Sequence, residues 1–288
     1  MSHAYYVPAG GLPPQTQMTA GRAIFTEAYA VIPRDVLCDI VTSLLPGWQQ
    51  TRAWILARPM TGFAETFSQM ILEVAPGGGA SLPEPEPEAE GVYFVVGGEL
   101  ELTHDGTCHR LTPGSFVYLP PGTDYSVANR SDANATFHWI RKAYEPVAGL
   151  DAPDFFTVNE ADLTPLEMPD TKGAWSTTLF VDPRDMRHDM HVTIVSMLPG
   201  GVIPFTETHV MEHGLYVLGG KAVYRLNADW VEVEAGDFMW LRAFCPQGCY
   251  AGGTEPFRYL LYKDMHRFPG LRAGQPSGPR MIGRPDRA

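Results

Sequence analysis

The sequence contains two copies of one pattern, one in each half of the chain. Glycines and apolar segments of the first copy recur 122 or 123 positions later, so that Gly98 corresponds to Gly220 and Gly114 to Gly236. The matched segments are 69–78 with 195–201, 92–102 with 215–225, and 111–119 with 233–241. A repeat of this length is typical of a duplicated domain and is too long for a solenoid unit. We therefore predict two tandem domains, residues 1–148 and 149–288, with the seam near 145–153.

The repeated segments favour β-strands. Alternating apolar residues flank the pairs Gly97-Gly98 and Gly219-Gly220, and this pattern predicts a hairpin with a two-residue turn in each half. The segments that follow Gly114 and Gly236 indicate further strands. The abundance of glycine (29) and proline (26), together with 11% aromatic residues, fits many short strands joined by tight turns. The expected fold class is therefore all-β.

Three segments depart from this pattern. Residues 33–45 are the only stretch that predicts a short helix. Residues 83–87 alternate proline with glutamate, and we expect an exposed loop because prolines donate no hydrogen bond to a sheet. The end of the chain from Leu271 is rich in Gly, Pro and Arg, which predicts an extended arm.

Composition excludes several classes of protein. The formal net charge of −12 argues against nucleic acid and anionic membranes as partners. Four cysteines in 288 residues are too few for a disulfide framework, and Cys245 and Cys249 are expected to be ordinary thiols. The sequence shows neither a signal-peptide pattern nor an apolar run of the roughly 18 residues that a membrane helix needs. A cytoplasmic protein is the expectation.

One stretch of the second half contains a group of side chains that can bind a metal ion. Glu207-Thr-His209-Val-Met-Glu-His213 places three side chains that can bind metal within seven residues, among residues that favour strands and turns. Residues two apart on a strand face the same way, so Glu207 and His209 would both point into a barrel. His213 can join them if the chain stays extended or crosses a hairpin. This pattern predicts one divalent metal ion in a small β-barrel, and therefore an enzyme.

The same letters fit a second motif. His209-Val-Met-Glu212-His213 matches H-x-x-E-H, the signature of inverted zinc peptidases. That motif requires a helix that places both histidines on one face. Pro204, two threonines and a following Gly-Gly pair make such a helix improbable here. In a strand, Glu212 would instead point away from the metal.

Each half resembles a cupin, a small antiparallel barrel with two short motifs. The second half reads Gly201-x5-Glu207-x-His209-x3-His213-x6-Gly220, with Glu in the first His position and His in the Glu position. Its second motif has Gln247 where the last His ligand would stand. The first half keeps the frame Gly114-x5-Pro120-x-Gly122-x2-Tyr125. The positions of the metal ligands, however, are occupied by Pro85, Pro87, Gly91 and Tyr125, which do not form a metal-binding set. We expect one metal-binding barrel and one structural barrel, a bicupin of the double-stranded β-helix (jelly-roll) type.

The ligand pattern is similar to that of the (S)-ureidoglycine aminohydrolases, bicupins of purine and allantoin breakdown, over roughly residues 19–267. This resemblance implies Mn²⁺ bound by Glu207, His209, His213 and Gln247. It also implies that Tyr224, Tyr259 and Lys263 hold the substrate. The implied reaction is hydrolysis of (S)-ureidoglycine to (S)-ureidoglycolate and ammonium, with Glu207 or Lys263 as the proton carrier. The implied partner is a small ureido compound, and the implied assembly is a homo-oligomer.

Other functions stay open at this point. Carboxylate, amide and two imidazoles suit Mn(II), but Fe(II) or Zn(II) would also fit this set of ligands. The chain could therefore be another metallocupin enzyme, such as an Fe(II) dioxygenase or a sugar isomerase. It could also be a non-catalytic module that binds a small acid. No segment resembles the helix-turn-helix domain that a DNA-reading sensor of that kind usually carries.

Overall fold

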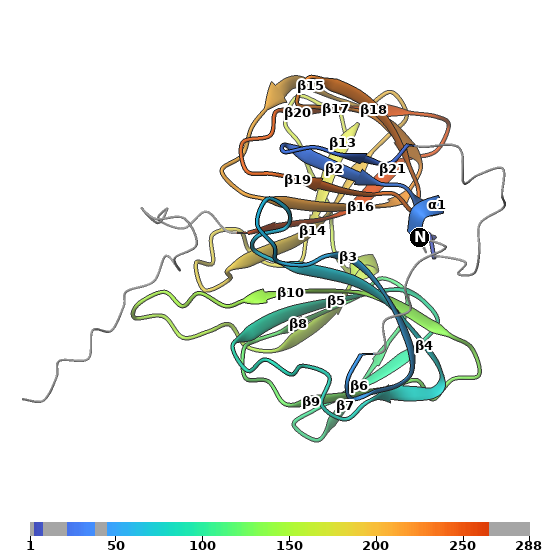
Figure 1. The fold of residues 1–288 in the computed structure, drawn as a ribbon, viewed down its shortest axis with the longest axis vertical. Helices are drawn as coiled ribbons and strands as arrows, with labels where there is room; N and C mark the ends of the chain where they lie inside the picture. Colours follow the sequence, from blue (N-terminus) through green and yellow to red (C-terminus); the bar gives the residue numbers. More distant parts are fainter. Residues whose placement is uncertain (1–2, 8–21, 38–44, 265–288) are drawn as a thin grey trace, which may run out of the picture.

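The computed structural model describes residues 3–7, 22–37 and 45–264, and it shows two β-barrels stacked on one another (Figure 1). Strands make up nearly all of the regular structure in these ranges, which confirms the all-β expectation. The helical elements among the described residues are α1 (Arg34–Leu37) and a 3₁₀ turn, η1 (Glu160–Asp162). The helix expected over 33–45 thus begins as predicted, and its residues 38–44 lie outside the described ranges, as does the arm from Leu271.

The N-terminal barrel is one curved nine-stranded sheet, with its strands in the order β11-β8-β5-β10-β4-β9-β6-β7 and with β3 paired to β4. Its strands are β3 (Trp48–Ala57), β4 (Ser68–Ala80), β5 (Ala89–Gly97), β6 (Leu100–His104), β7 (Thr107–Leu111), β8 (Ser115–Leu119), β9 (Tyr125–Ala128), β10 (Ala135–Ala143) and β11 (Phe156–Asn159). All pairings are antiparallel.

The C-terminal barrel consists of two sheets. The eight-stranded sheet has the order β1-β2-β19-β16-β21-β14-β13-β12, and the four-stranded sheet has the order β15-β20-β17-β18. The strands are β1 (Ile24–Phe25), β2 (Tyr29–Ile32), β12 (Leu166–Glu167), β13 (Trp175–Leu179), β14 (Met190–Met197), β15 (Val202–Glu207), β16 (His213–Gly219), β17 (Lys221–Leu226), β18 (Asp229–Glu234), β19 (Phe238–Leu241), β20 (Gln247–Gly252) and β21 (Phe257–Asp264).

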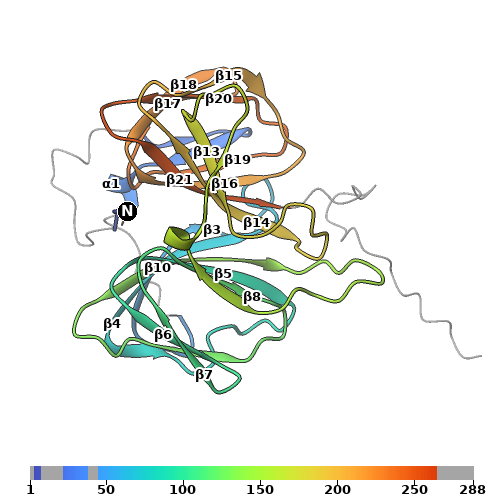
Figure 2. The same ribbon diagram turned by 180° about the vertical axis from the view of Figure 1, so that it is seen from behind.

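The two barrels exchange edge strands. Strand β2, near the start of the chain, pairs with β19 of the C-terminal barrel, with Tyr29 opposite Leu241. Strand β11, which follows the seam of the repeat, pairs with β8 of the N-terminal barrel. Figure 2 shows both crossings from behind. The division at residues 148 and 149 therefore describes the repeat in the sequence, while each barrel is completed by a strand from the other half.

The Gly-Gly pairs are corners and not hairpins, so that prediction was wrong. Strands β5 and β6 flank the first pair but belong to different pairings, β5 with β8 and β10, and β6 with β7 and β9. Strands β16 and β17 behave in the same way in the second barrel. Gly98 and Gly220 have φ of 69° and 70°, and an added Cβ would lie 2.2 Å and 2.4 Å from a backbone oxygen. Only glycine fits such a corner, where the chain leaves one group of paired strands and enters another.

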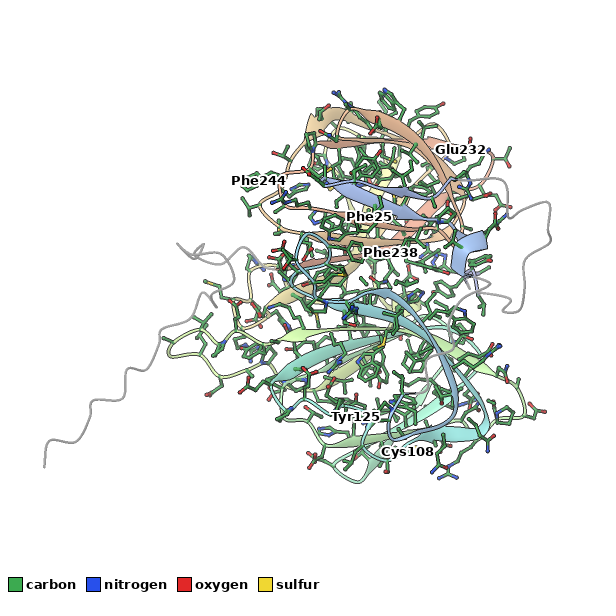
Figure 3. All side chains as sticks on the ribbon, in the orientation of Figure 1. Phe25, Cys108, Tyr125, Glu232, Phe238 and Phe244 are labelled. Atoms are coloured by element: carbon green, nitrogen blue, oxygen red, sulfur yellow. The ribbon has the colours of Figure 1, made fainter. Side chains whose placement is uncertain are left out.

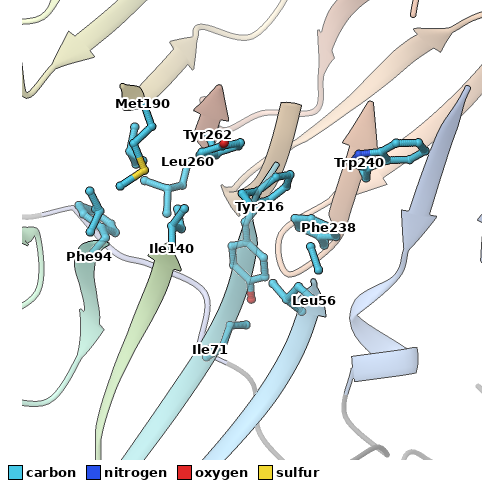
Figure 4. Close-up of a cluster of buried hydrophobic side chains, with 14 of the residues drawn as sticks. Leu56, Ile71, Phe94, Ile140, Met190, Tyr216, Phe238, Trp240, Leu260 and Tyr262 are labelled. Carbon is cyan, nitrogen blue, oxygen red and sulfur yellow. The ribbon is translucent and has the colours of Figure 1, made fainter. Parts of the chain in front are cut away.

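Buried apolar residues form three clusters. One fills the interior of each barrel, and the third joins the two barrels. In the third cluster, Ile71, Phe94 and Ile140 of the N-terminal barrel meet Tyr216, Leu260 and Tyr262 of the C-terminal barrel (Figure 4). Because strand residues alternate between two faces, β16 and β21 present one set to this interface and the other to the interior of their own barrel. That alternation decides which residues can reach a site inside the barrel.

The remaining sequence predictions can be compared with the structure directly. Residues 83–88 form no strand and are largely exposed, as expected for the proline-rich segment. Cys245 and Cys249 are free thiols and both are buried. No helix in the described ranges is both long enough and apolar enough to span a bilayer.

Candidate metal centre

The register of the C-terminal barrel brings the four predicted ligands to one end of it. Glu207, the last residue of β15, lies opposite Gln247, the first residue of β20. His213 begins β16 and lies opposite Lys263 of β21. Interior neighbours on the same strands, among them Leu215, Val217 and Cys249, show that His213 and Gln247 face into the barrel. Both side chains are buried, at 3% and 4% exposed.

His209 reaches this end of the barrel by a different route from the one predicted. Strand β15 ends at Glu207, and residues 208–212 are irregular, so His209 does not continue the strand. Its Nε2 nevertheless lies 3.4 Å from Oε1 of Glu207, and its ring stacks on that of His213 with 5.0 Å between centroids. Because residues 208–212 form no helix, the inverted-peptidase alternative loses the geometry that it requires.

A loop over the end of the barrel holds His209 in place. The N–H of Phe244 donates a 2.6 Å hydrogen bond to the carbonyl oxygen of His209. Phe244 has a φ of 66°, a conformation that a bulky residue rarely adopts. The residue is 63% exposed and lies at the edge of the barrel (Figure 3). The corresponding residue of the N-terminal barrel is Gly122, with a φ of 74°. The loop thus keeps the backbone shape of a glycine turn without the glycine.

The His213 imidazole has the properties of a ligand. Its Nδ1 is buried and has no hydrogen-bond partner among the described residues. Burial lowers the pKa of His213 to about 4, and the nearby His209 and Lys263 act in the same direction. The ring is therefore neutral at physiological pH, which is the form that binds metal. An unpaired buried nitrogen costs free energy unless it gains a partner, and a metal ion is one partner that a neutral imidazole can take.

Glu207, His209, His213 and Gln247 fit a divalent cation by chemistry, since they offer two imidazole nitrogens, a carboxylate and an amide oxygen. As the side chains stand, however, no three His, Cys, Asp or Glu residues within the described ranges lie close enough together to hold an ion. The Glu207 carboxylate instead contacts His209. The ligand set thus stays a prediction.

The predicted substrate residues lie on the interior side of the same end. Tyr224 and Tyr259 are buried with their rings edge to face at 6.2 Å, and Lys263 is half-buried opposite His213. Burial raises the pKa of both tyrosines well above 10, so their hydroxyls stay protonated and can donate. Burial lowers the pKa of Lys263, and the Glu207 carboxylate opposes that shift. The Cys249 thiol, beside Tyr224, has a pKa raised to about 12 by burial and is therefore not a nucleophile.

Sequence reasoning missed two groups near the site. His191 of β14 lies opposite Lys263, on the face that also carries Val195 and Met197 into the barrel interior. The alternation of residues 191, 193, 195 and 197 was the signal that could have found it. Glu212 does point away from the predicted ligands, as expected. It accepts hydrogen bonds from Glu65 and Thr66 of the N-terminal barrel and from Trp240 of β19, which no sequence pattern suggested.

Comparison with known proteins agrees with this architecture. The cupin domain model matches residues 70–141 and 193–262. The chain is 31% identical over 249 residues to a protein of Oryza sativa subsp. japonica named "Probable (S)-ureidoglycine aminohydrolase", covering 86% of this chain and 76% of that protein. It is 28% identical to the (S)-ureidoglycine aminohydrolase of Escherichia coli (strain K12), covering 87% of this chain and 94% of that protein.

A solved structure extends the likeness to three dimensions. A Pseudomonas aeruginosa protein named as glyoxylate-induced superposes with a TM-score of 0.89 at 62% identity, covering 94% of this chain and 99% of that one. The tandem barrels, the matched cupin segments and the identity over most of the chain agree with one another. The chain therefore belongs to the (S)-ureidoglycine aminohydrolase family of bicupin enzymes.

Proposed function

We propose that this enzyme uses Mn²⁺ to hydrolyse (S)-ureidoglycine to (S)-ureidoglycolate and ammonium. The observation that carries the proposal is the convergence of Glu207, His209, His213 and Gln247 at one end of a barrel whose family is named for this activity. In the reaction a C–N bond to the amine breaks and a C–O bond from water forms. The setting would be purine and allantoin catabolism in the cytoplasm.

The four converging side chains would hold the ion, which supplies Lewis-acid chemistry when bound. Two imidazoles, a carboxylate and an amide leave open positions on a six-coordinate ion for a small chelating anion. The absence of a thiolate from the set disfavours soft metals and supports Mn²⁺. The neutral His213 supports binding at neutral pH, because no proton has to leave before the ring can act as a ligand.

Lys263 would bind the substrate carboxylate as a point charge, and Tyr224 and Tyr259 would donate hydrogen bonds to the ureido oxygen. Their burial supports this role, since donors fixed in an interior hold a small substrate in one orientation. Glu207 and Lys263 are the candidate proton carriers. The lowered pKa of Lys263 makes it a stronger acid than a free lysine, which favours it as the group that protonates the departing amine.

The proposed partners follow from charge and chemistry. A net charge of −12 disfavours nucleic acid and anionic membranes, and the buried interior suits a small ureido molecule. We also propose a homo-oligomer, because tandem cupins commonly associate. Size-exclusion chromatography with light scattering tests the last point, and a single species at the monomer mass of 31.7 kDa would refute it.

An ammonia-release assay on freshly prepared (S)-ureidoglycine tests the reaction. Protein stripped of metal and reloaded with Mn²⁺ should release ammonium well above the spontaneous rate, without oxygen, and stripped protein should not. Release no faster than the spontaneous rate under any metal loading would refute the proposal. Oxygen consumption with Fe(II) would instead identify a dioxygenase.

A further inference from the structure

Glu212 is a buried carboxylate that the proposed reaction does not use. It is 6% exposed and lies between the irregular residues 208–211 and the first strand residue, His213. Its two oxygens accept four hydrogen bonds, from Glu65 N–H at 2.8 Å, Thr66 N–H at 2.9 Å, the Thr66 hydroxyl at 2.6 Å and the Trp240 indole N–H at 2.6 Å. Three of these donors belong to the loop that leads into β4 of the N-terminal barrel, which binds no metal in our proposal.

The backbone of Glu212 is tied to the other side of the site. Its N–H donates a 2.8 Å hydrogen bond to Oδ1 of Asp264, the residue next to Lys263. His213 and Lys263 are cross-strand partners. Glu212 therefore connects the beginning of β16 with the end of β21. The predicted ligand His213 lies at the first of these places and the predicted substrate contact Lys263 at the second.

The loop of the N-terminal barrel fits closely against this pair of strands. Phe67 stacks on Tyr262 with 4.0 Å between ring centroids and 25° between planes. A Cβ added to Gly214 would lie 2.7 Å from the Phe67 ring, so only glycine permits this approach. The Thr66 hydroxyl also lies 3.1 Å from that of Tyr262. The loop is thus packed directly behind the strand that begins with His213.

A carboxylate is a poor choice if the two barrels merely had to adhere. Burying a charge costs several kcal/mol of desolvation, and an apolar side chain of similar size holds an interface equally well or better. Four directed hydrogen bonds fix the position and orientation of the main chain on either side of Glu212, which an apolar contact does not do. The geometry therefore suits placement of neighbouring groups more than adhesion.

We infer that the N-terminal barrel positions the active site of the C-terminal barrel through Glu212, which acts as a positioning residue for His213 and Lys263. The expected change in turnover rests on the proposed function. The expected change in the position of His213 does not depend on it. A shift of about 1 Å in a catalytic group can lower the rate by about 10²-fold, so small changes at the loop are measurable in kcat.

Thr66→Val tests the inference from the opposite barrel, because it removes one hydroxyl and keeps the shape of the side chain. The matched control is Thr51→Val, which removes a 2.8 Å hydrogen bond to Gln49 O within the N-terminal barrel. In the Mn²⁺-loaded enzyme we expect Thr66→Val to lower kcat about 10-fold with bound Mn²⁺ unchanged, and Thr51→Val to lower it less than 2-fold. Glu212→Gln should lower kcat further, again without loss of metal.

A second measurement needs neither metal nor turnover. In metal-free protein labelled with [¹³C]histidine, the His213 signal, assigned by its loss in His213→Asn, should move in Thr66→Val and stay in place in Thr51→Val. An unmoved His213 signal in Thr66→Val and Glu212→Gln, or equal activity losses in the two valine variants, would overturn the inference. If the wild-type enzyme releases no ammonium, the proposed function fails while the histidine signals still decide whether the loop positions His213.

Discussion

The two barrels share a frame and differ in what stands at one end of it. The positions of Glu207, His209, His213 and Gln247 are taken in the N-terminal barrel by Pro85, Pro87, Gly91 and Tyr125. Those four residues line a single cavity of about 150 Å³ in the N-terminal barrel. The frame thus brings these positions together whatever residues occupy them. Whether a barrel can hold metal is a matter of a few side chains, while the barrel itself depends on strands and corner glycines.

The two barrels also carry a positively charged side chain at one equivalent position. Lys263 lies at the end of its barrel where the predicted ligands meet. Its counterpart in the other barrel is Arg141, which lies opposite Gly91. Arg141 forms a largely buried ion pair with Glu84 and stacks over Trp139 at 5.2 Å. A positively charged side chain thus stands at the same position in both barrels. Arg141 forms an ion pair within the N-terminal barrel, whereas Lys263 lies beside the predicted ligands of the C-terminal barrel.

The largest expected effect comes from removing a ligand in one barrel and its counterpart in the other. His209→Ala should lose bound Mn²⁺ and reduce ammonium release to the spontaneous rate, because one of two imidazoles is gone. Pro87→Ala should leave both unchanged. Elemental analysis after dialysis measures the bound Mn²⁺ of both variants, and the ammonia assay measures their activity. Full metal content in His209→Ala would remove His209 from the ligand set.

Lys263→Met should lower kcat/KM about 10²-fold, roughly 3 kcal/mol of transition-state stabilisation, while metal content stays at the wild-type level. The reason is that Lys263 contacts the substrate carboxylate in our proposal and no ligand is removed. Steady-state kinetics with (S)-ureidoglycine measure the loss. Unchanged kcat/KM would assign carboxylate binding to another group.

Arg141→Met, the counterpart, should act on stability and not on catalysis. It leaves Glu84 without its partner in a site where the two side chains are 16% and 13% exposed, and we expect a loss of about 1–3 kcal/mol in unfolding free energy. Urea unfolding followed by tryptophan fluorescence measures this loss. A fall in kcat/KM with stability intact would show that the N-terminal cavity takes part in the reaction.

A pH effect is expected at the contact between the barrels. His138 is fully buried against Tyr216, and neither ring nitrogen has a hydrogen-bond partner within the described ranges. Burial lowers the pKa of His138 to about 3, whereas its counterpart in β21 is Leu260. The unfolded chain, with a pKa near 6.5, takes up a proton that the folded one does not. Stability is therefore full above pH 6.5 and falls as the pH drops below it, by up to about 2 kcal/mol at pH 5.

His138→Leu makes the two strands alike at this position and should remove that part of the acid sensitivity. The measurement is the difference in urea unfolding free energy between pH 7.5 and pH 5 for both proteins. An equal difference in the variant would show that other groups carry the pH dependence.

The smallest expected effect concerns the glycine turn. Phe244→Gly restores the residue that the N-terminal barrel has at Gly122, and should raise the unfolding free energy by about 1 kcal/mol by relieving the positive φ. Thermal unfolding measures the change, with Gly122→Phe as the reverse exchange, which should destabilise. Destabilisation by Phe244→Gly would instead show that packing of the ring outweighs the backbone strain.

Several features could be read from the residues alone. The 122-residue repeat predicted two barrels, because each copy carries its own strands and glycine corners and can form its own core. The ligand candidates were found because three side chains that can bind metal fall within seven residues of a strand-rich segment. The hairpins at Gly97-Gly98 and Gly219-Gly220 were predicted wrongly. An apolar–Gly-Gly–apolar pattern does not tell whether the next strand pairs with the one before it or with other strands of the barrel.

Local sequence determined the strands, the corners and the identity of the candidate ligands, because these depend on neighbours within a few residues. Only the tertiary structure decided the exchange of β2 and β11 between barrels, the entry of His191 into the interior opposite Lys263, and the capture of Glu212 by the loop at Thr66. These contacts join residues up to about two hundred positions apart. Pairing across such distances is set by how whole sheets pack, which no short pattern in the chain records.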